Sequence, residues 1–136
     1  MSVRRIAVEE AFVTPEIADE WDKVLTSKFV EPGFLKMGES ILAKNEGTRV
    51  IHAKLIDLGA GRIAQMDSDG IDLAVLSLTS PGVQAFDAVT ATELAAQSND
   101  VLAAAVKKYP KRFAGLGRHR AALSQGRGQG AGAGGR

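Results

Sequence analysis

The alternation of apolar and polar residues predicts a first strand over residues 5–12. Its side chains divide into a large apolar side and a smaller side: Ile6 and Val8, against Ala7, Glu9 and Ala11. We expect the large apolar side to pack against helices and the smaller side to carry Glu9 inward, at the end of the strand. Glu10 should then point the other way.

Beyond this strand the hydrophobic pattern changes period. Residues 13–47 are interrupted by prolines and glycine, which indicates an excursion with one or two helical turns near residues 16–21. Apolar residues between 48 and 66 recur at helical spacing, and Gly70 is a suitable stop, so one helix is predicted. The apolar run over residues 71–79, IDLAVLSLT, is typical of a buried parallel strand.

A second helix and a third strand follow. Residues 90–93, TATE, match a capping box, and the helical pattern continues to Pro110. Residues 112–116 then predict a strand. The order of strand, excursion, helix, strand, helix and strand indicates an α/β fold with parallel crossovers, as in the opening part of a larger domain.

Composition narrows the class of protein. The 136 residues are 45% hydrophobic and 24% charged, as in ordinary globular proteins. The absence of cysteine excludes disulfides and thiolate metal sites and fits a cytoplasmic protein. No apolar run approaches the roughly 20 residues of a membrane helix, so we expect no membrane partner.

The last part of the chain has a different character. After Asp100 all charged residues are basic, and residues 118–136 form a Gly/Arg/Ala-rich tail without helix or strand period. We therefore divide the chain into a domain at 1–117 and a tail at 118–136. Its composition favours disorder, and a frameshift product is another interpretation. RNA binding is the third, but the arginines are sparse and no aromatic residue lies among them, so we do not expect nucleic acid as a partner. Read one nucleotide later, residues 125–136 permit KAAAKELER, which is a good helix former.

Other candidate metal ligands have simpler interpretations. Asp67, Asp69 and Asp72 resemble an acidic metal cluster but straddle a helix end and a strand start, where acids are well solvated. His52 falls on a predicted helix surface, and His119 falls in the tail.

Three stretches, RIAVEEAF, LIDLGAGRIAQMDSDGIDLAVLSLTSPGVQ and AAQSNDVLAAAVKKYPKRFAGLG, resemble the amino-terminal part of a known family. This family comprises the metal-dependent decarboxylases of the amidohydrolase superfamily, which include γ-resorcylate and 5-carboxyvanillate decarboxylases. The resemblance implies the amino-terminal part, about three βα units, of a TIM-like (β/α)₈ barrel, with an irregular tail.

The resemblance also assigns residues. Glu9 matches a ligand of a divalent metal, Mn²⁺ or Zn²⁺, and Ala11 stands where most relatives have a second ligand, a histidine. Ala11 and the Leu-Thr-Ser-Pro-Gly-Val-Gln stretch resemble the 5-carboxyvanillate subgroup, in which Thr79 is a candidate substrate contact. The plainer alternatives are a solvated acid at Glu9 and a loop hydroxyl bonded to its own backbone at Thr79.

The implied reaction is the non-oxidative decarboxylation of a hydroxybenzoate-type aromatic acid, in which the metal anchors the substrate and an acid protonates the ring carbon. That acid, an aspartate, and the remaining ligands lie beyond this chain, so no catalytic residue is assigned within it. The chain would be a carboxy-lyase fragment, inactive alone, whose full-length relatives are homo-oligomers. The alternative is a small α/β binding protein with a basic tail that contacts RNA or another anion.

Overall fold

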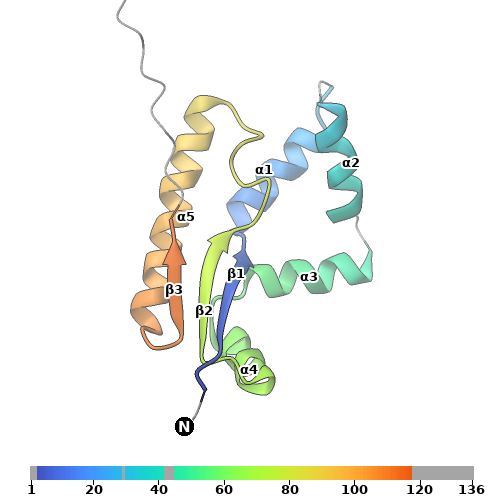
Figure 1. Ribbon diagram of the computed structural model, residues 1–136. Coiled ribbons are helices and arrows are strands. Elements are labelled where there is room, and N and C mark those ends of the chain that lie inside the picture. The colour runs from blue at the N-terminus through green and yellow to red at the C-terminus, as the bar shows by residue number, and fades with distance from the viewer. Residues whose placement is uncertain (1–2, 29, 42–44, 118–136) are drawn as a thin grey trace, which may run out of the picture.

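The computed structural model describes residues 3–28, 30–41 and 45–117 and gives them an α/β fold (Figure 1). Its elements in chain order are β1 (Ile6–Phe12), α1 (Pro15–Leu25), α2 (Pro32–Ile41), α3 (Glu46–Ile56), α4 (Ala60–Asp69), β2 (Leu73–Leu78), α5 (Ala88–Lys108) and β3 (Phe113–Leu116). The predicted tail at 118–136 lies outside the described residues. In the described ranges, no helix combines the length and the apolar character that crossing a bilayer requires.

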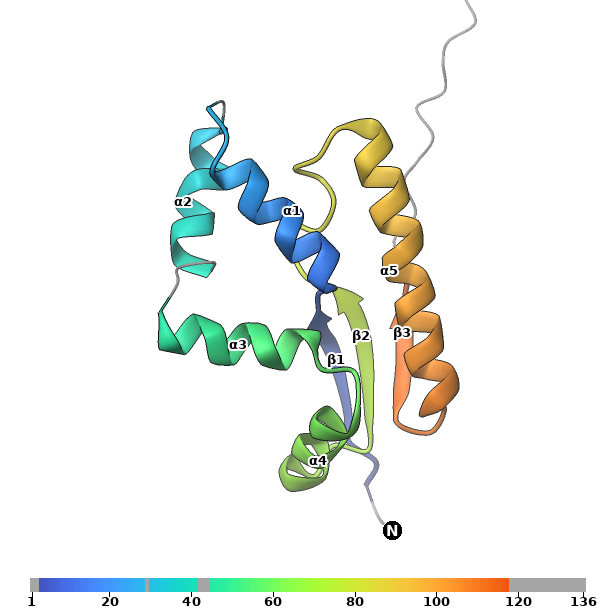
Figure 2. The same ribbon diagram turned by 180° about the vertical axis from the view of Figure 1, so that it is seen from behind.

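The three strands form one parallel sheet in the order β1-β2-β3, which confirms the predicted crossovers. Helix α5 connects β2 to β3 and runs beside β3 (Figures 1 and 2). Helices α1, α2 and α3 form an arm that leaves the end of β1, extends to one side of the sheet and returns to it before α4. The predicted excursion is therefore larger than one or two turns. It contains two helices, α1 and α2, before α3 begins.

The sheet has one covered face and one open face. Residues Ala74, Leu76 and Leu78 of β2 are buried, and their register partners include Phe12 of β1 and Phe113 of β3, which are also buried. Since register partners in a sheet share a face, these residues define the side that the helices cover. We use the name open face for the opposite side, which carries Ile6, Val8, Val75, Ala114 and Leu116.

The prediction that Ile6 and Val8 pack against helices is wrong. Ile6 is 51% exposed and Val8 is 68% exposed, and Ile6 pairs with Leu73 on the open face. The cause is a bulge in β1. Because one extra residue stands between Ala7 and Glu10, simple alternation counted along the sequence assigns the wrong face to part of the strand.

The core lies between the covered face and helices α1, α4 and α5. Its largest fully buried side chains are Trp21, Phe12, Phe113, Ile17 and Leu76. Tyr109 closes one end by packing its ring edge-on to Phe113, with centroids 5.5 Å apart and an interplanar angle of 79°.

Where one helix is predicted over residues 48–66, the structure has two helices separated by residues 57–59. Asp57 takes an extended conformation, with ψ of 105°, and its Oδ1 accepts a hydrogen bond from the Gly59 amide at 2.7 Å. A short acid that bonds to backbone two residues ahead competes with helix continuation. Helix α4 then ends at Gly70 as predicted, with φ of 68°.

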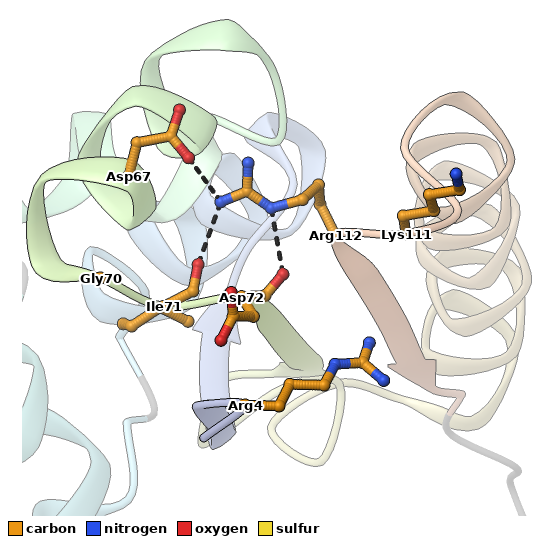
Figure 3. A pocket seen from close by; sticks show the side chains of 7 residues that line it. All are labelled: Arg4, Asp67, Gly70, Ile71, Asp72, Lys111 and Arg112. Carbon is orange, nitrogen blue, oxygen red and sulfur yellow. Dashed lines mark hydrogen bonds and ion pairs between the residues drawn. The ribbon is translucent and has the colours of Figure 1, made fainter. Parts of the chain in front are cut away.

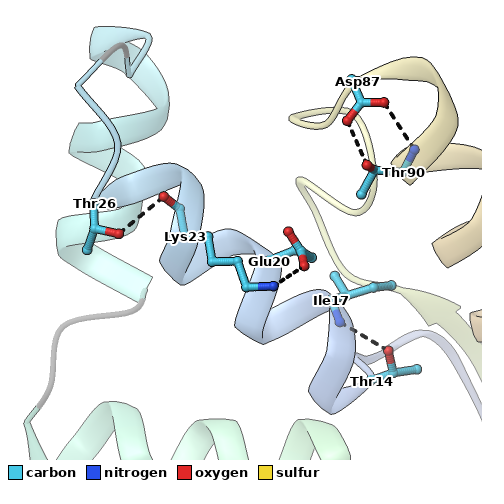
Figure 4. A network of polar contacts seen from close by, with 7 residues as sticks. All are labelled: Thr14, Ile17, Glu20, Lys23, Thr26, Asp87 and Thr90. Carbon is cyan, nitrogen blue, oxygen red and sulfur yellow. Dashed lines mark hydrogen bonds and ion pairs between the residues drawn. The ribbon is translucent and has the colours of Figure 1, made fainter.

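Side-chain caps fix where α1 and α5 begin (Figure 4). Thr14 caps α1 by accepting from the Ile17 amide at 3.4 Å. Asp87, and not the predicted Thr90, caps α5, because its Oδ1 accepts from the amides of Val89 at 2.9 Å and Thr90 at 3.1 Å. The Thr90 hydroxyl donates to Asp87 Oδ2 at 2.6 Å, so this threonine supports the cap from inside the helix.

Candidate functional site

Glu9 lies in the bulge of β1. Ala7 pairs with Ala74 and Glu10 pairs with Leu76, so Val8 and Glu9 together stand opposite Val75. Among the described residues, Glu9 is the non-glycine residue with a positive φ, at 63°. A side chain in this left-handed region costs of order 1–3 kcal/mol and persists only where the surroundings impose it.

The bulge also sets the direction of Glu9. Glu10 lies on the covered face, where its Oε2 is 4.0 Å from Nη1 of Arg62. Because side chains alternate along a strand, Glu9, which directly precedes Glu10, is assigned to the open face. Its side chain is exposed, and within the described residues its carboxylate makes no hydrogen bond or ion pair. Glu9 therefore offers free oxygen atoms on the open face.

Glu9 is not at the end of its strand as predicted, because β1 continues to Phe12. At roughly 3.3 Å per residue, Glu9 lies about 10 Å before that end.

Thr79 follows β2 directly and is half-buried. Its amide donates to the Phe12 carbonyl at 2.9 Å, so the residue sits at the carboxyl edge of the sheet beside the end of β1. Its hydroxyl has no hydrogen-bond partner within the described part of the chain. Thr79 lies four residues of strand rise, about 13 Å, beyond the level of Glu9 along the strand direction, so the structure does not bring the two side chains together.

The loop after Thr79 is held in place by the arm. The Ser80–Pro81 peptide bond is cis, and Gly82 has a φ of 61°. The indole Nε1 of Trp21, from α1, donates to the Gly82 carbonyl at 2.8 Å, and both residues are buried. The arm thereby contributes to the shape of the loop that carries Thr79.

A divalent metal fits this site only in part. Glu9 can supply one oxygen ligand, of the type that Mn²⁺ accepts. Ala11, which pairs with Ser77 on the open face, has no donor atom in its side chain. Within the described residues, no three His, Cys, Asp or Glu side chains converge on a possible metal position. A metal held at Glu9 would therefore need further ligands that the described residues do not bring to this position.

The three acids that resemble a metal cluster have protein partners instead. Asp67 pairs with Arg112 at 2.7 Å, Asp69 accepts from Gln65 at 2.9 Å, and Asp72 accepts from the Arg5 amide at 2.7 Å. These contacts are structural. They connect α4, β1 and the start of β3 at the amino-terminal edge of the sheet, opposite the edge that carries Thr79.

An open hollow of about 590 Å³ lies at this amino-terminal edge (Figure 3). Arg112 reaches across it and donates to the backbone carbonyls of Ile71 and Asp72, both at 3.0 Å. Arg4 and Lys111 also line the hollow, and the carboxylates of Asp67 and Asp72 offset two of the three positive charges there. The residues that line the hollow therefore connect neighbouring helices and strands, and the hollow has no strong preference for an anion.

Sequence reasoning missed Arg62, the third residue of α4. Its side chain is only 11% exposed. It donates from Nε to the Asp57 carbonyl at 2.8 Å and from Nη2 to the carbonyls of Ala11 at 2.9 Å and Lys54 at 2.7 Å. Burial lowers the pKa of the guanidinium, and the negative charges of Glu10 and Asp57 oppose that shift. An arginine on an amphipathic helix gives no sequence signal for such a role.

Comparison with known proteins shows that the chain is similar to part of several enzymes. A γ-resorcylate decarboxylase from Rhizobium sp. is 33% identical over 110 residues, covering 80% of this chain and 28% of the enzyme. The structure of 5-carboxyvanillate decarboxylase from Novosphingobium aromaticivorans, complexed with manganese and 4-hydroxy-3-methoxy-5-nitrobenzoic acid, is 43% identical with a TM-score of 0.81. That match covers 87% of this chain and 34% of the enzyme.

A dihydroxybenzoic acid decarboxylase from Polaromonas sp., with bound manganese and the inhibitor 2-nitroresorcinol, is 30% identical with a TM-score of 0.64 over 86% of this chain and 30% of the enzyme. No family model matches the chain. These relatives confirm the predicted resemblance to metal-dependent aromatic acid decarboxylases. The chain spans about a third of their length or less.

Proposed function

We propose that this chain supplies the first strands of a metal-dependent, non-oxidative decarboxylase of hydroxybenzoate-type aromatic acids. The observation that carries the proposal is the position of Glu9. Its carboxylate is free within the described residues and points to the open face of a parallel sheet, in a chain that is 43% identical to an enzyme solved with manganese.

The open face supports this assignment physically. In a (β/α)₈ barrel, helices cover one face of the sheet and the other face becomes the interior, with the active site toward the carboxyl ends of the strands. Here the helices cover the face of Leu76 and leave the face of Glu9 open. The same face carries Ile6, Val8 and Leu116, which are apolar and suited to a barrel interior.

Each residue receives one role. Glu9 would give one oxygen ligand to a divalent metal, which we take to be Mn²⁺ because manganese is bound in the related structures. Thr79, at the carboxyl edge and on a loop fixed by Trp21, would contact the aromatic carboxylate substrate. We propose no residue of this chain as the acid that protonates the ring carbon, so we expect the chain to be inactive alone.

The test begins with the DNA that follows the codon of Gly117. We expect one of its reading frames to encode further strands and metal ligands, and the protein expressed from that frame to release CO₂ from 5-carboxyvanillate or γ-resorcylate with Mn²⁺. Glu9→Gln should abolish this release. Glu10→Gln is the matched control, because Glu10 lies on the covered face, and it should retain most of the activity.

Two results would reject the proposal. One is a downstream sequence without patterned strands in any frame. The other is a decarboxylase that keeps its activity and its manganese after Glu9→Gln. Salt-sensitive RNA binding by the present chain, lost on deletion of residues 118–136, would instead support a binding protein.

A further inference from the structure

Arg62 is a charged residue in a place that does not favour charge. Its side chain is largely covered, and it stands in the first turn of α4, where the helix dipole disfavours a cation. Burying a charge is costly unless hydrogen bonds and counter-charges replace the lost water. The contacts of Arg62 must therefore offset two penalties.

Those contacts join three segments of the chain. The guanidinium binds one carbonyl in the last turn of α3, at Lys54, one in the α3–α4 connection, at Asp57, and one in β1, at Ala11. A planar fork with five donors can hold several carbonyls at once in fixed relative positions, which lysine cannot do. Arg62 thus fixes the corner between α3 and α4 to β1, close to the carboxyl end of that strand.

The contact with β1 falls directly after the bulge. Ala11 is two residues from Glu9, and the carboxylate of Glu10 lies 4.0 Å from the same guanidinium. The segment after Glu9 is therefore held from the covered side, while Glu9 itself has a positive φ that ordinary strand geometry would not select. Something outside the strand must maintain that conformation.

We propose that Arg62 is a positioning residue that holds the bulge of β1 in the conformation that directs the Glu9 carboxylate to the open face. It acts through the backbone of residues 9–11 and does not touch the metal or the substrate. The inference rests on the proposed function for the role of Glu9 as a ligand, but the conformational part can be measured without metal or substrate.

The experiment compares the full chain with two variants by NMR. Arg62→Met keeps the length of the side chain and removes every donor, whereas Arg62→Lys keeps the charge and loses the fork. Arg112→Met is the matched control, because Arg112 also binds two backbone carbonyls and one carboxylate, at the opposite edge of the sheet.

We expect the Cα and Cβ shifts of Glu9 to report a left-handed residue in the unmodified chain and in Arg112→Met. In Arg62→Met they should move to extended values, and the amides of residues 9–11 should exchange at least about fivefold faster, as expected for a lost hydrogen bond. Arg62→Lys should fall between these limits. If Arg62→Met fails to fold, Arg62→Lys decides the question by the same shifts.

Left-handed shifts at Glu9 in a folded Arg62→Met chain would overturn the inference, as would an equal loss in Arg112→Met. A separate measurement addresses the ligand role. Mn²⁺ added to the unmodified chain should broaden the side-chain signals of Glu9 more than those of Glu10. If Glu9 is not broadened more than Glu10, the result counts against the proposed function. The role of Arg62 is still decided by the chemical shifts of Glu9.

Discussion

Glu9 combines conformational strain with a free carboxylate. Its φ of 63° is a position where glycine would be at ease, and its side chain gains no partner within the described residues to compensate for the strain. A residue that is unfavourable for its backbone position and makes no stabilising contact is best explained by a use for its chemistry. The proposed role as a metal ligand gives it that use.

Substitution at position 9 should therefore invert the usual order of alanine and glycine. Within a strand glycine is normally less stable than alanine, but we expect Glu9→Gly to be more stable than Glu9→Ala by about 1–2 kcal/mol, because only glycine adopts a positive φ without strain. Urea unfolding at equal m-values measures the difference. Ala7→Gly, before the bulge, should show the normal order and destabilise the chain. A Glu9→Gly variant less stable than Glu9→Ala would contradict the assigned backbone conformation.

Glu9 also shows which features of a single residue could be predicted from the sequence. The alternation over residues 5–12 and the family resemblance both single out Glu9. The extra residue in the bulge could not be predicted, because glutamate carries no signal for a positive φ and no glycine marks the position. This single insertion is why Ile6 and Val8 were assigned to the wrong face.

Among the elements, β3 depends on a glycine for its approach to α5. A Cβ atom at Gly115 would lie 2.8–3.0 Å from three side-chain atoms of Leu102, which is buried in the core. We expect Gly115→Ala to destabilise the chain by about 1–3 kcal/mol through overpacking. Thermal unfolding followed by circular dichroism measures the loss. Adding Leu102→Val should recover part of it, and a Gly115→Ala variant as stable as the unmodified chain would show that β3 does not pack this closely.

The cap of α5 gives a prediction about pH. Hydrogen bonds from the Thr90 hydroxyl and from the amides of Thr90 and Val89 lower the pKa of Asp87 below its ordinary value. Because the folded state has the lower pKa, the stabilisation by Asp87 is complete above the ordinary pKa and disappears as the pH falls through the lowered value. Asp87→Asn retains a cap that does not titrate.

The melting temperature of the unmodified chain should therefore fall relative to that of Asp87→Asn as the pH decreases from about 6 to about 3, the range around the ordinary aspartate pKa. Thermal melts of both proteins across this range measure the gap. A gap that is independent of pH would indicate that Asp87 is not the cap of α5.

At the element scale the sequence was informative where the pattern was long and uninterrupted. The strand β2 follows from its continuous apolar run and the helix α5 from its helical period. The helix ends before Gly70 and Pro110 were predicted because these residues commonly end a helix. The break at residues 57–59 could not be predicted from periodicity, because apolar residues continue across it at helical spacing. The break comes from one side-chain contact, Asp57 to the Gly59 amide.

At the scale of the whole molecule, the described chain buries only one of the two faces of its sheet. Its helices bury one face of the sheet around Phe12, Leu76 and Phe113, and the other face exposes Ile6, Val8 and Leu116. Both edge strands, β1 and β3, have no neighbouring strand on one side within the described residues. Apolar surface and free sheet edges favour association with other chains.

We therefore expect the isolated chain to self-associate through the open face. Val8→Lys places a charge on that face and should shift sedimentation velocity profiles toward monomer, because a charge in an apolar contact must be desolvated. Val89→Lys is the matched control, since Val89 is 66% exposed on α5 against 68% for Val8, and it should leave the association unchanged. If both variants reduce association equally, the contact is not specific to the open face. An unmodified chain that is a monomer with a sharp cooperative melt would contradict this prediction. Three strands covered on one side would then form a stable unit, and no further strands would be needed to complete the core.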